Sequence, residues 1–152
     1  MKRALVFTLA LAFGGLAQAG AGDQVSVVDP YVRLSPPNAP ATGAFMILKN
    51  NGDKPVRLVK ASNPVSRITE LHDHINENGV MKMRAIASVD IPAGGEAVLR
   101  PGGLHVMMIE LQTPLREGDV IPLTLVFDDG SQLLVQAPVV RPTLRPARMS
   151  HR

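Results

Sequence analysis

Two clusters of histidine and methionine are the residues in this sequence most able to do chemistry. Four histidines and six methionines follow residue 19, and most of them fall in two segments, LHDHINENGVMKM (71–83) and LHVMM (104–108). Packing a hydrophobic core does not require this clustering. Thioether sulfur is a soft, neutral donor that favours Cu(I) over Zn²⁺, Mg²⁺ or Ca²⁺, so imidazole and thioether together predict a Cu(I) site.

The first segment is predicted to form a β-hairpin that places its donors on one face of a sheet. A turn at residues 76–79 would pair His74 with Met81 and His72 with Met83. A tighter turn at the last two of these residues would shift the pairing by two and keep the same face. Opposed side chains have Cβ atoms about 5 Å apart, so a nitrogen and a sulfur can reach one ion. The pattern does not choose between the two histidines or between the two methionines.

The second segment supplies one further histidine and one further methionine. His105 and Met107 are two residues apart in a predicted strand, so they share a face with Cα atoms about 7 Å apart. Added to a His–Met pair of the hairpin, they complete a pocket of two nitrogen and two sulfur donors. Neutral ligands leave the charge of Cu(I) unneutralised, which favours carriage of the ion over storage. Met46 and Met108 are assigned to the core, where methionine packs adaptably.

The N-terminus has the pattern of a cleavable secretory signal. Lys2 and Arg3 precede a short apolar run (4–16), and residues 17–19 (AQA) have the small-x-small pattern of a cleavage site. The run is shorter than the roughly 18 apolar residues that a membrane span requires. We therefore expect cleavage after Ala19, a periplasmic protein, and no membrane insertion of the mature chain.

Composition excludes several classes of function. Removing Lys2 and Arg3 with the signal lowers the formal charge from +3 to +1, and no basic stripe follows, so nucleic acid is not an expected partner. The absence of cysteine excludes blue-copper electron carriers, iron–sulfur proteins and thiol redox enzymes. Small secreted domains usually rely on disulfides, so this one must be stabilised by its core instead.

Short apolar stretches separated by turn residues predict an all-β fold. Gly and Asn accept positive φ and Pro cannot join a central ladder, so their clusters mark turns. No stretch after residue 19 keeps a helical period for three turns, and many short strands at this spacing predict a sandwich or barrel. We expect strands at 25–28, 44–50, 56–61, 68–72, 80–83, 96–100, 104–111, 121–127 and 132–140.

The chain is expected to contain one folded domain. Residues 1–19 are the signal peptide, residues 20–140 form the β-sandwich domain, and residues 141–152 form a flexible C-terminal tail. The tail contains two prolines and four arginines, a composition typical of segments without a packed core.

The order and spacing of the donors match a known signature. The pattern His72-x10-Met83-x21-His105-x-Met107 resembles that of the periplasmic copper chaperones called PCuAC. The similarity covers roughly residues 25–140. The segments that carry it are YVRLSPP (31–37), TGAFMILKN (42–50), ELHDH (70–74), NGVMKMR (78–84), IPAGGEAVLRPGGLHVMM (91–108) and PLREGDVIPLTLVF (114–127).

This resemblance implies both a fold and a function. It implies a cupredoxin-like, immunoglobulin-like β-sandwich that binds Cu(I) through the four residues of the signature, with His74 and Met81 as neighbours rather than ligands. It also implies delivery of copper to the dinuclear CuA centre of cytochrome c oxidase. The expected partner is subunit II of that oxidase or a thiol-based copper chaperone, bound transiently by a monomer.

Two departures from the family pattern concern the surroundings of the site. Leu104 stands where many relatives have tyrosine, which alters the shielding of the site and removes no ligand. Some relatives carry a longer tail rich in Met and His that takes Cu(II). Met149 and His151 are a reduced version of that tail and are the candidates for a secondary Cu(II) site.

Other classes of function give different expectations. A copper monooxygenase of the sandwich type uses an N-terminal histidine, whereas cleavage after Ala19 leaves Gly20 first, so we expect no enzyme. A metal-free secreted β-sandwich interaction module would use the same methionines and histidines as core residues. A copper storage or resistance protein would use the same ligands without delivery.

Overall fold

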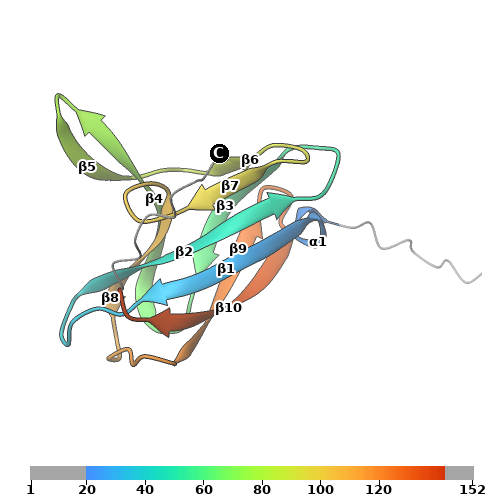
Figure 1. Cartoon of the computed structure of the whole chain (residues 1–152). Helices are drawn as coiled ribbons and strands as arrows, with labels where there is room; N and C mark the ends of the chain where they lie inside the picture. Colours follow the sequence, from blue (N-terminus) through green and yellow to red (C-terminus); the bar gives the residue numbers. More distant parts are fainter. Residues whose placement is uncertain (1–19, 143–152) are drawn as a thin grey trace, which may run out of the picture.

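The structure, a computed structural model, describes residues 20–142 and consists almost entirely of strands (Figure 1). Each expected strand is present, several extend further than their apolar stretch, and the all-β class is confirmed. In chain order the elements are α1 (Ala21–Gln24), β1 (Val25–Arg33), β2 (Ala41–Asn50), β3 (Val56–Ser62), β4 (Ser66–Glu77), β5 (Val80–Ala85), β6 (Val89–Ile91), β7 (Glu96–Leu99), β8 (His105–Leu111), β9 (Val120–Phe127) and β10 (Gln132–Val140).

Two short elements were not expected from the sequence. Strand β6 has three residues and α1 has one helical turn, so neither is long enough to show a period. Within residues 20–142 the structure contains no helix with the length and apolar character needed to cross a membrane.

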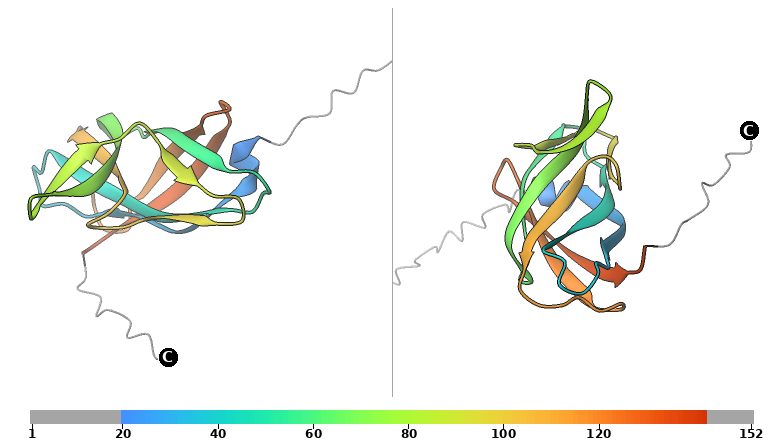
Figure 2. Two further views of the ribbon diagram at one scale, coloured as in Figure 1. Left: turned by 90° about the horizontal axis from the view of Figure 1, so that it is seen from above. Right: turned by 90° about the vertical axis from the view of Figure 1, so that its left-hand side faces the viewer.

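The strands form two layers that pack face to face (Figure 2). One layer has the order β5-β4-β8-β2-β1, and β7 pairs with the same edge of β2 as β8 does, further along the strand. The other layer has the order β10-β9-β3-β6. A short parallel pairing of β1 with β10 joins the layers, with Val32 opposite Val139. The result is the expected β-sandwich, in which the strands of both layers have one face toward a common core.

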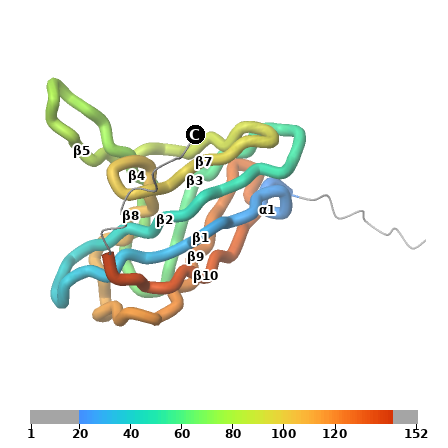
Figure 3. The backbone as a smooth tube through the Cα atoms, viewed as in Figure 1, coloured from blue at the N-terminus to red at the C-terminus, as the bar shows by residue number. Residues whose placement is uncertain are grey.

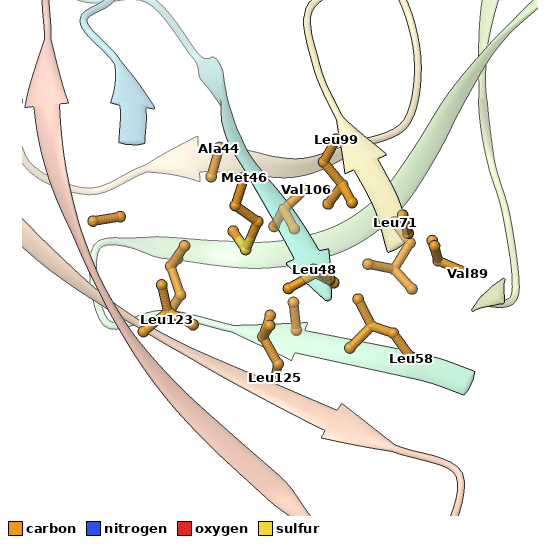
Figure 4. Packing of buried hydrophobic residues seen from close by; sticks show 14 of the residues in the cluster. Ala44, Met46, Leu48, Leu58, Leu71, Val89, Leu99, Val106, Leu123 and Leu125 are labelled. Atoms are coloured by element: carbon orange, nitrogen blue, oxygen red, sulfur yellow. The ribbon is translucent and has the colours of Figure 1, made fainter. Parts of the chain in front are cut away.

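The core lies between the layers and is almost purely aliphatic (Figure 4). Apart from β5, the strands turn alternate residues toward it, as the period of two dictates, and β9 buries Leu123 and Leu125 completely. Met46 on β2 and Met108 on β8 are 2 % and 0 % exposed, which confirms their assignment to the core. Each fully buried side chain of this size stabilises the fold by about 1.5–3 kcal/mol, so a domain without disulfides has a sufficient source of stability.

The β4–β5 hairpin projects beyond the two layers (Figures 1 and 3). Strand β4 pairs with β8 from Ser66 to His72 and with β5 from His72 to Glu77. Past His72 the hairpin therefore has two strands only, and every residue of β5 is exposed. One half of this hairpin belongs to the sandwich and the other half extends into solvent.

Candidate metal centre

The centre of the candidate site is the outer face of the layer that contains β8. His105 lies directly opposite His72 in the β4–β8 ladder, and Met107 lies opposite Gly43 in the β2–β8 ladder. Val106, between the two donors, is completely buried in the core. His105 and Met107 therefore share the outer face, as their two-residue spacing predicts.

The turn of the β4–β5 hairpin is the tighter of the two considered from the sequence. Glu77 pairs with Val80, so the loop contains only Asn78 and Gly79. Both have positive φ, 53° and 84°, as the commonest two-residue hairpin turn requires. Asn and Gly accept this conformation at low cost, which explains why a four-residue turn does not form.

This turn fixes which donors face one another. His74 lies directly opposite Met83, whereas His72 lies opposite Ala85. The pairing of His72 with Met83 and of His74 with Met81, expected from a four-residue turn, is wrong because the register is shifted by two residues. All four still share one face, because a shift of two keeps the side-chain alternation. Met81 is 56 % exposed and lies nearer the end of the hairpin.

Four donors line a single pocket of about 430 Å³ on this face. They are His74, Met83, His105 and Met107. Met83 is 46 % exposed, so the pocket is open to solvent on its hairpin side. His72 lies beside the pocket, opposite His105, and is not part of its lining. The structure thus brings all three histidines of the two segments together with two of the methionines.

His105 is buried and its ring is held by the backbone. It is 4 % exposed, and its Nδ1–H donates a hydrogen bond of 2.9 Å to the carbonyl oxygen of Gly103. Burial lowers the pKa of His105 below its ordinary value of 6.5, and the hydrogen bond to Gly103 offsets this only in part. The ring is therefore neutral near pH 7, and Nε2 is the nitrogen with a free lone pair.

His72 has the opposite arrangement of its two ring nitrogens. Its Nε2–H donates a hydrogen bond of 2.6 Å to Oε2 of Glu70. Its Nδ1 atom is buried and has no hydrogen-bond partner. A buried polar atom without a partner is costly, and a carboxylate that holds the far nitrogen is the usual arrangement behind a metal-bound histidine.

Both β4 histidines lie at a distance from His105 that one ion could bridge. The ring centroids of His72 and His105 are 5.7 Å apart, and those of His74 and His105 are 5.3 Å apart. A metal bound to imidazole lies about 2 Å from the nitrogen, so two rings on one ion have centroids about 5–6 Å apart. Either pair fits this range.

An aromatic residue that the sequence analysis did not single out supports the site from β2. The ring of Phe45 lies 6.0 Å from that of His105 and 5.2 Å from that of Tyr31, centroid to centroid. The guanidinium of Arg33 lies over Phe45 at 5.5 Å from the centroid, within cation–π range. Phe45 lies two residues after Gly43, the partner of Met107, and therefore on the face of the donors, a relation that depends on the β2–β8 register.

The remaining candidate residues fall outside this cluster. Met149 and His151 lie outside the described residues, as does the expected signal peptide at 1–19. Among residues 20–142, no group of three or more histidine, aspartate or glutamate side chains is arranged to hold a metal ion. The donor set described above combines imidazole with thioether, a chemistry suited to a soft monovalent ion.

Comparison with known proteins places this chain in a family. Residues 25–139 match the LpqE-like family model, described as "Putative lipoprotein LpqE-like". A curated relative, "Putative lipoprotein Lxx21020" of Leifsonia xyli subsp. xyli, is 36 % identical over 118 residues, which are 77 % of this chain and 70 % of the relative.

Solved structures share the fold. The solution structure of CuI-DR1885 from Deinococcus radiodurans is 34 % identical, with a TM-score of 0.57 over 81 % of this chain and 80 % of that one. The copper-bound PCuAC domain from PmoF2 is 20 % identical, with a TM-score of 0.66 over 78 % of this chain and 94 % of that domain. The resemblance to PCuAC proteins and the cupredoxin-like β-sandwich expected from it are confirmed. The chain belongs to the LpqE-like family, and its fold is that of the PCuAC domains.

Proposed function

We propose that this protein is a Cu(I)-binding metallochaperone that acts outside the cytoplasm. The observation that carries the proposal is the gathering of imidazole and thioether donors from β4, β5 and β8 on one face of the sandwich. The similar DR1885 structure is described as Cu(I)-bound and the PmoF2 domain as copper-bound, which supports copper as the cargo.

The proposed ligands are His72, Met83, His105 and Met107, the four residues of the sequence signature. All four donors are neutral when copper binds, so they stabilise Cu(I) through softness and geometry rather than through charge. His105 offers Nε2, because its Nδ1–H is held by Gly103. The role of the protein in this proposal is to bind and release the ion, without bond-breaking chemistry.

Delivery by ligand exchange follows from the exposure of the site. Met83 is 46 % exposed whereas His105 is 4 % exposed, so a docked partner can replace the methionine before it reaches the histidine. We propose the dinuclear CuA centre of cytochrome c oxidase as the destination, with subunit II of the oxidase or a thiol-based copper chaperone as the transient partner. We propose that the protein acts as a monomer in this exchange.

A location outside the cytoplasm is supported by two independent features. The first nineteen residues have the pattern of a secretory signal, and the descriptions of both the family and its curated relative begin with the words "Putative lipoprotein". The sequence contains no cysteine, so none of its residues can carry a lipid through a cysteine sulfur. We therefore propose release into the periplasm after Ala19.

Titration of Cu(I) against a competing chelator tests the binding proposal. We expect one tight site per chain, with affinity strongly weakened in Met107→Ala and in His105→Ala, and X-ray absorption that counts both sulfur and nitrogen neighbours. Unchanged affinity in both variants would contradict the ligand assignment. Zn²⁺ at the same concentration is the control and should not displace Cu(I), because thioethers are poor ligands for it.

Transfer of copper tests the delivery proposal separately. The Cu(I)-loaded protein should metallate a copper-free CuA domain of oxidase subunit II faster than Cu(I) bound to the competing chelator does. Tight binding without transfer would instead favour copper storage.

A further inference from the structure

We propose that Cu(I) exchanges between two overlapping positions in this site, an outer one that uses His74 and an inner one in which Nδ1 of His72 replaces His74. This proposal rests on the proposed function and deepens it. His105, Met83 and Met107 are common to both positions. His74 thus binds Cu(I) during transfer and is more than a neighbour of the site.

The outer position follows from the pocket and from the register. His74 lines the open pocket with Met83, His105 and Met107, which gives two nitrogen and two sulfur donors without His72. His74 is also the direct cross-strand neighbour of Met83, whereas His72 lies opposite Ala85. An ion that enters from solvent meets this set first.

The free nitrogen of His74 is identified by its other contact. Its Nδ1 lies 3.4 Å from the carbonyl oxygen of Gly103, which accepts a shorter hydrogen bond from His105. A carbonyl oxygen can only accept, so Nδ1 carries the proton and Nε2 is the available donor. The two neighbouring histidines therefore present the same nitrogen, and one carbonyl orients both rings.

The inner position follows from the unpartnered nitrogen of His72. Its Nδ1 is buried without a hydrogen-bond partner, while Nε2–H is held by Glu70 at 2.6 Å. The Glu70 carboxylate fixes the proton on Nε2 and leaves the Nδ1 lone pair as the donor. With a side chain only 12 % exposed, His72 can take the ion away from solvent.

The exchange between the two positions is chemically simple. The ring of His105 lies 5.3 Å from that of His74 and 5.7 Å from that of His72, so an ion held by His105 is within reach of both. One Cu–N bond forms as another breaks, copper stays Cu(I), and each donor is the ring nitrogen opposite the one held by a hydrogen bond, Nδ1 in His72 and Nε2 in His74. A partner that takes copper from the outer position needs no access to the buried one.

Nitrogen-15 NMR of histidine-labelled protein tests the proposal, because Cu(I) is diamagnetic. In the copper-free protein we expect the Nε2–H tautomer for His72 and the Nδ1–H tautomer for His74 and His105. On addition of one equivalent of Cu(I), the resonances of Nδ1 of His72 and Nε2 of His74 should both shift. Shifts of His72 and His105 with none at His74 would overturn the proposal and leave the proposed function intact. No shift at any histidine would overturn both.

Variants separate the two positions. His74→Phe keeps an aromatic ring beside His105 and removes the nitrogen donor. We expect it to slow transfer of Cu(I) to bathocuproine disulfonate several-fold, with little change in equilibrium affinity. Glu70→Ala removes the group that holds the His72 proton, so affinity should fall about ten-fold and the copper-induced shift of His74 should grow.

Met81→Leu is the matched control for these variants. Met81 shares the face of the hairpin and is 56 % exposed, and it does not line the pocket. Its replacement should leave both affinity and transfer rate unchanged. A His74→Phe protein that transfers copper at the rate of Met81→Leu would contradict a role for His74.

Discussion

Phe45 covers the backbone of Gly43: a Cβ atom added at Gly43 would lie 2.8 Å from Cζ of the Phe45 ring. Real Cβ atoms do not approach a neighbour so closely, so the ring keeps this place only because residue 43 has no side chain. The same ring contacts His105, and Gly43 itself lies opposite Met107. A glycine on β2 thereby determines the space beside two of the proposed ligands.

Gly43→Ala should disturb the site through Phe45. We expect a loss of about 1–3 kcal/mol in the free energy of unfolding, because the ring must move within a packed layer, and a several-fold weaker affinity for Cu(I). Urea unfolding and chelator competition measure these quantities. In a Phe45→Leu background the same substitution should cost less on both measures, and strictly additive effects would contradict the coupling.

Methionine-to-leucine substitutions should separate ligands from core residues. Met46→Leu and Met108→Leu keep the buried volume, so each should cost less than about 1.5 kcal/mol of stability and leave Cu(I) affinity unchanged. Met83→Leu and Met107→Leu should preserve stability and weaken Cu(I) binding at least about ten-fold, or ~1.4 kcal/mol. Loss of copper affinity in the two core variants would argue that the sulfur atoms of the site are wrongly identified.

The copper-free protein should lose stability on mild acidification. Burial lowers the pKa of His105 below 6.5, so the unfolded state takes up a proton at a higher pH than the folded state does. The stabilisation from the neutral ring is complete at pH values above the pKa of His105 in the unfolded state. It is lost as the pH falls through the lower pKa of the folded state. Urea midpoints at about pH 7.5 and about pH 5.5 measure it. His105→Gln should show a smaller difference between the two midpoints, and an equal difference would exclude His105 as the source.

The hairpin turn should affect copper binding without contacting copper. Gly79 has φ of 84°, and an added Cβ there meets no neighbouring atom, so Gly79→Ala changes backbone strain alone. The left-handed conformation costs about 1–2 kcal/mol for a residue with a side chain, which should loosen the β4–β5 pairing that positions Met83. We expect weaker Cu(I) binding with a nearly unchanged thermal midpoint of the sandwich. An equal loss on both measures would show that the hairpin and the sandwich unfold together.

The sequence predicted which residues share a face of a strand better than it predicted which residues lie opposite one another in the β4–β5 hairpin. A period of two is enough to place His105 and Met107 together, and the hairpin donors stay on one face in either register. Because both registers keep the donors on one face, the pattern could not choose the register that pairs His74 with Met83. The choice depends on the turn, where Asn78 and Gly79 accept positive φ.

The supporting residues could not be identified from the sequence because their roles depend on how the strands pack. Phe45 meets His105 only because β2 pairs with β8, across some sixty residues of chain. Glu70 is close to His72 in the chain, yet its significance depends on the His72 Nδ1 atom being buried without a partner, a fact of packing. Strand β6 was missed because three residues are too few to show a period.

The two-stranded part of the hairpin gives the molecule regions of unequal rigidity. Isolated pairs of strands are marginally stable in water, whereas the sandwich is closed around an aliphatic core. Amide protons of β5 should consequently exchange with solvent through brief local opening, and those of β8 only when the whole domain opens. Met83 can then separate from His105 many times while the sandwich stays folded. The rate of Cu(I) release is therefore set by local opening of the β4–β5 hairpin.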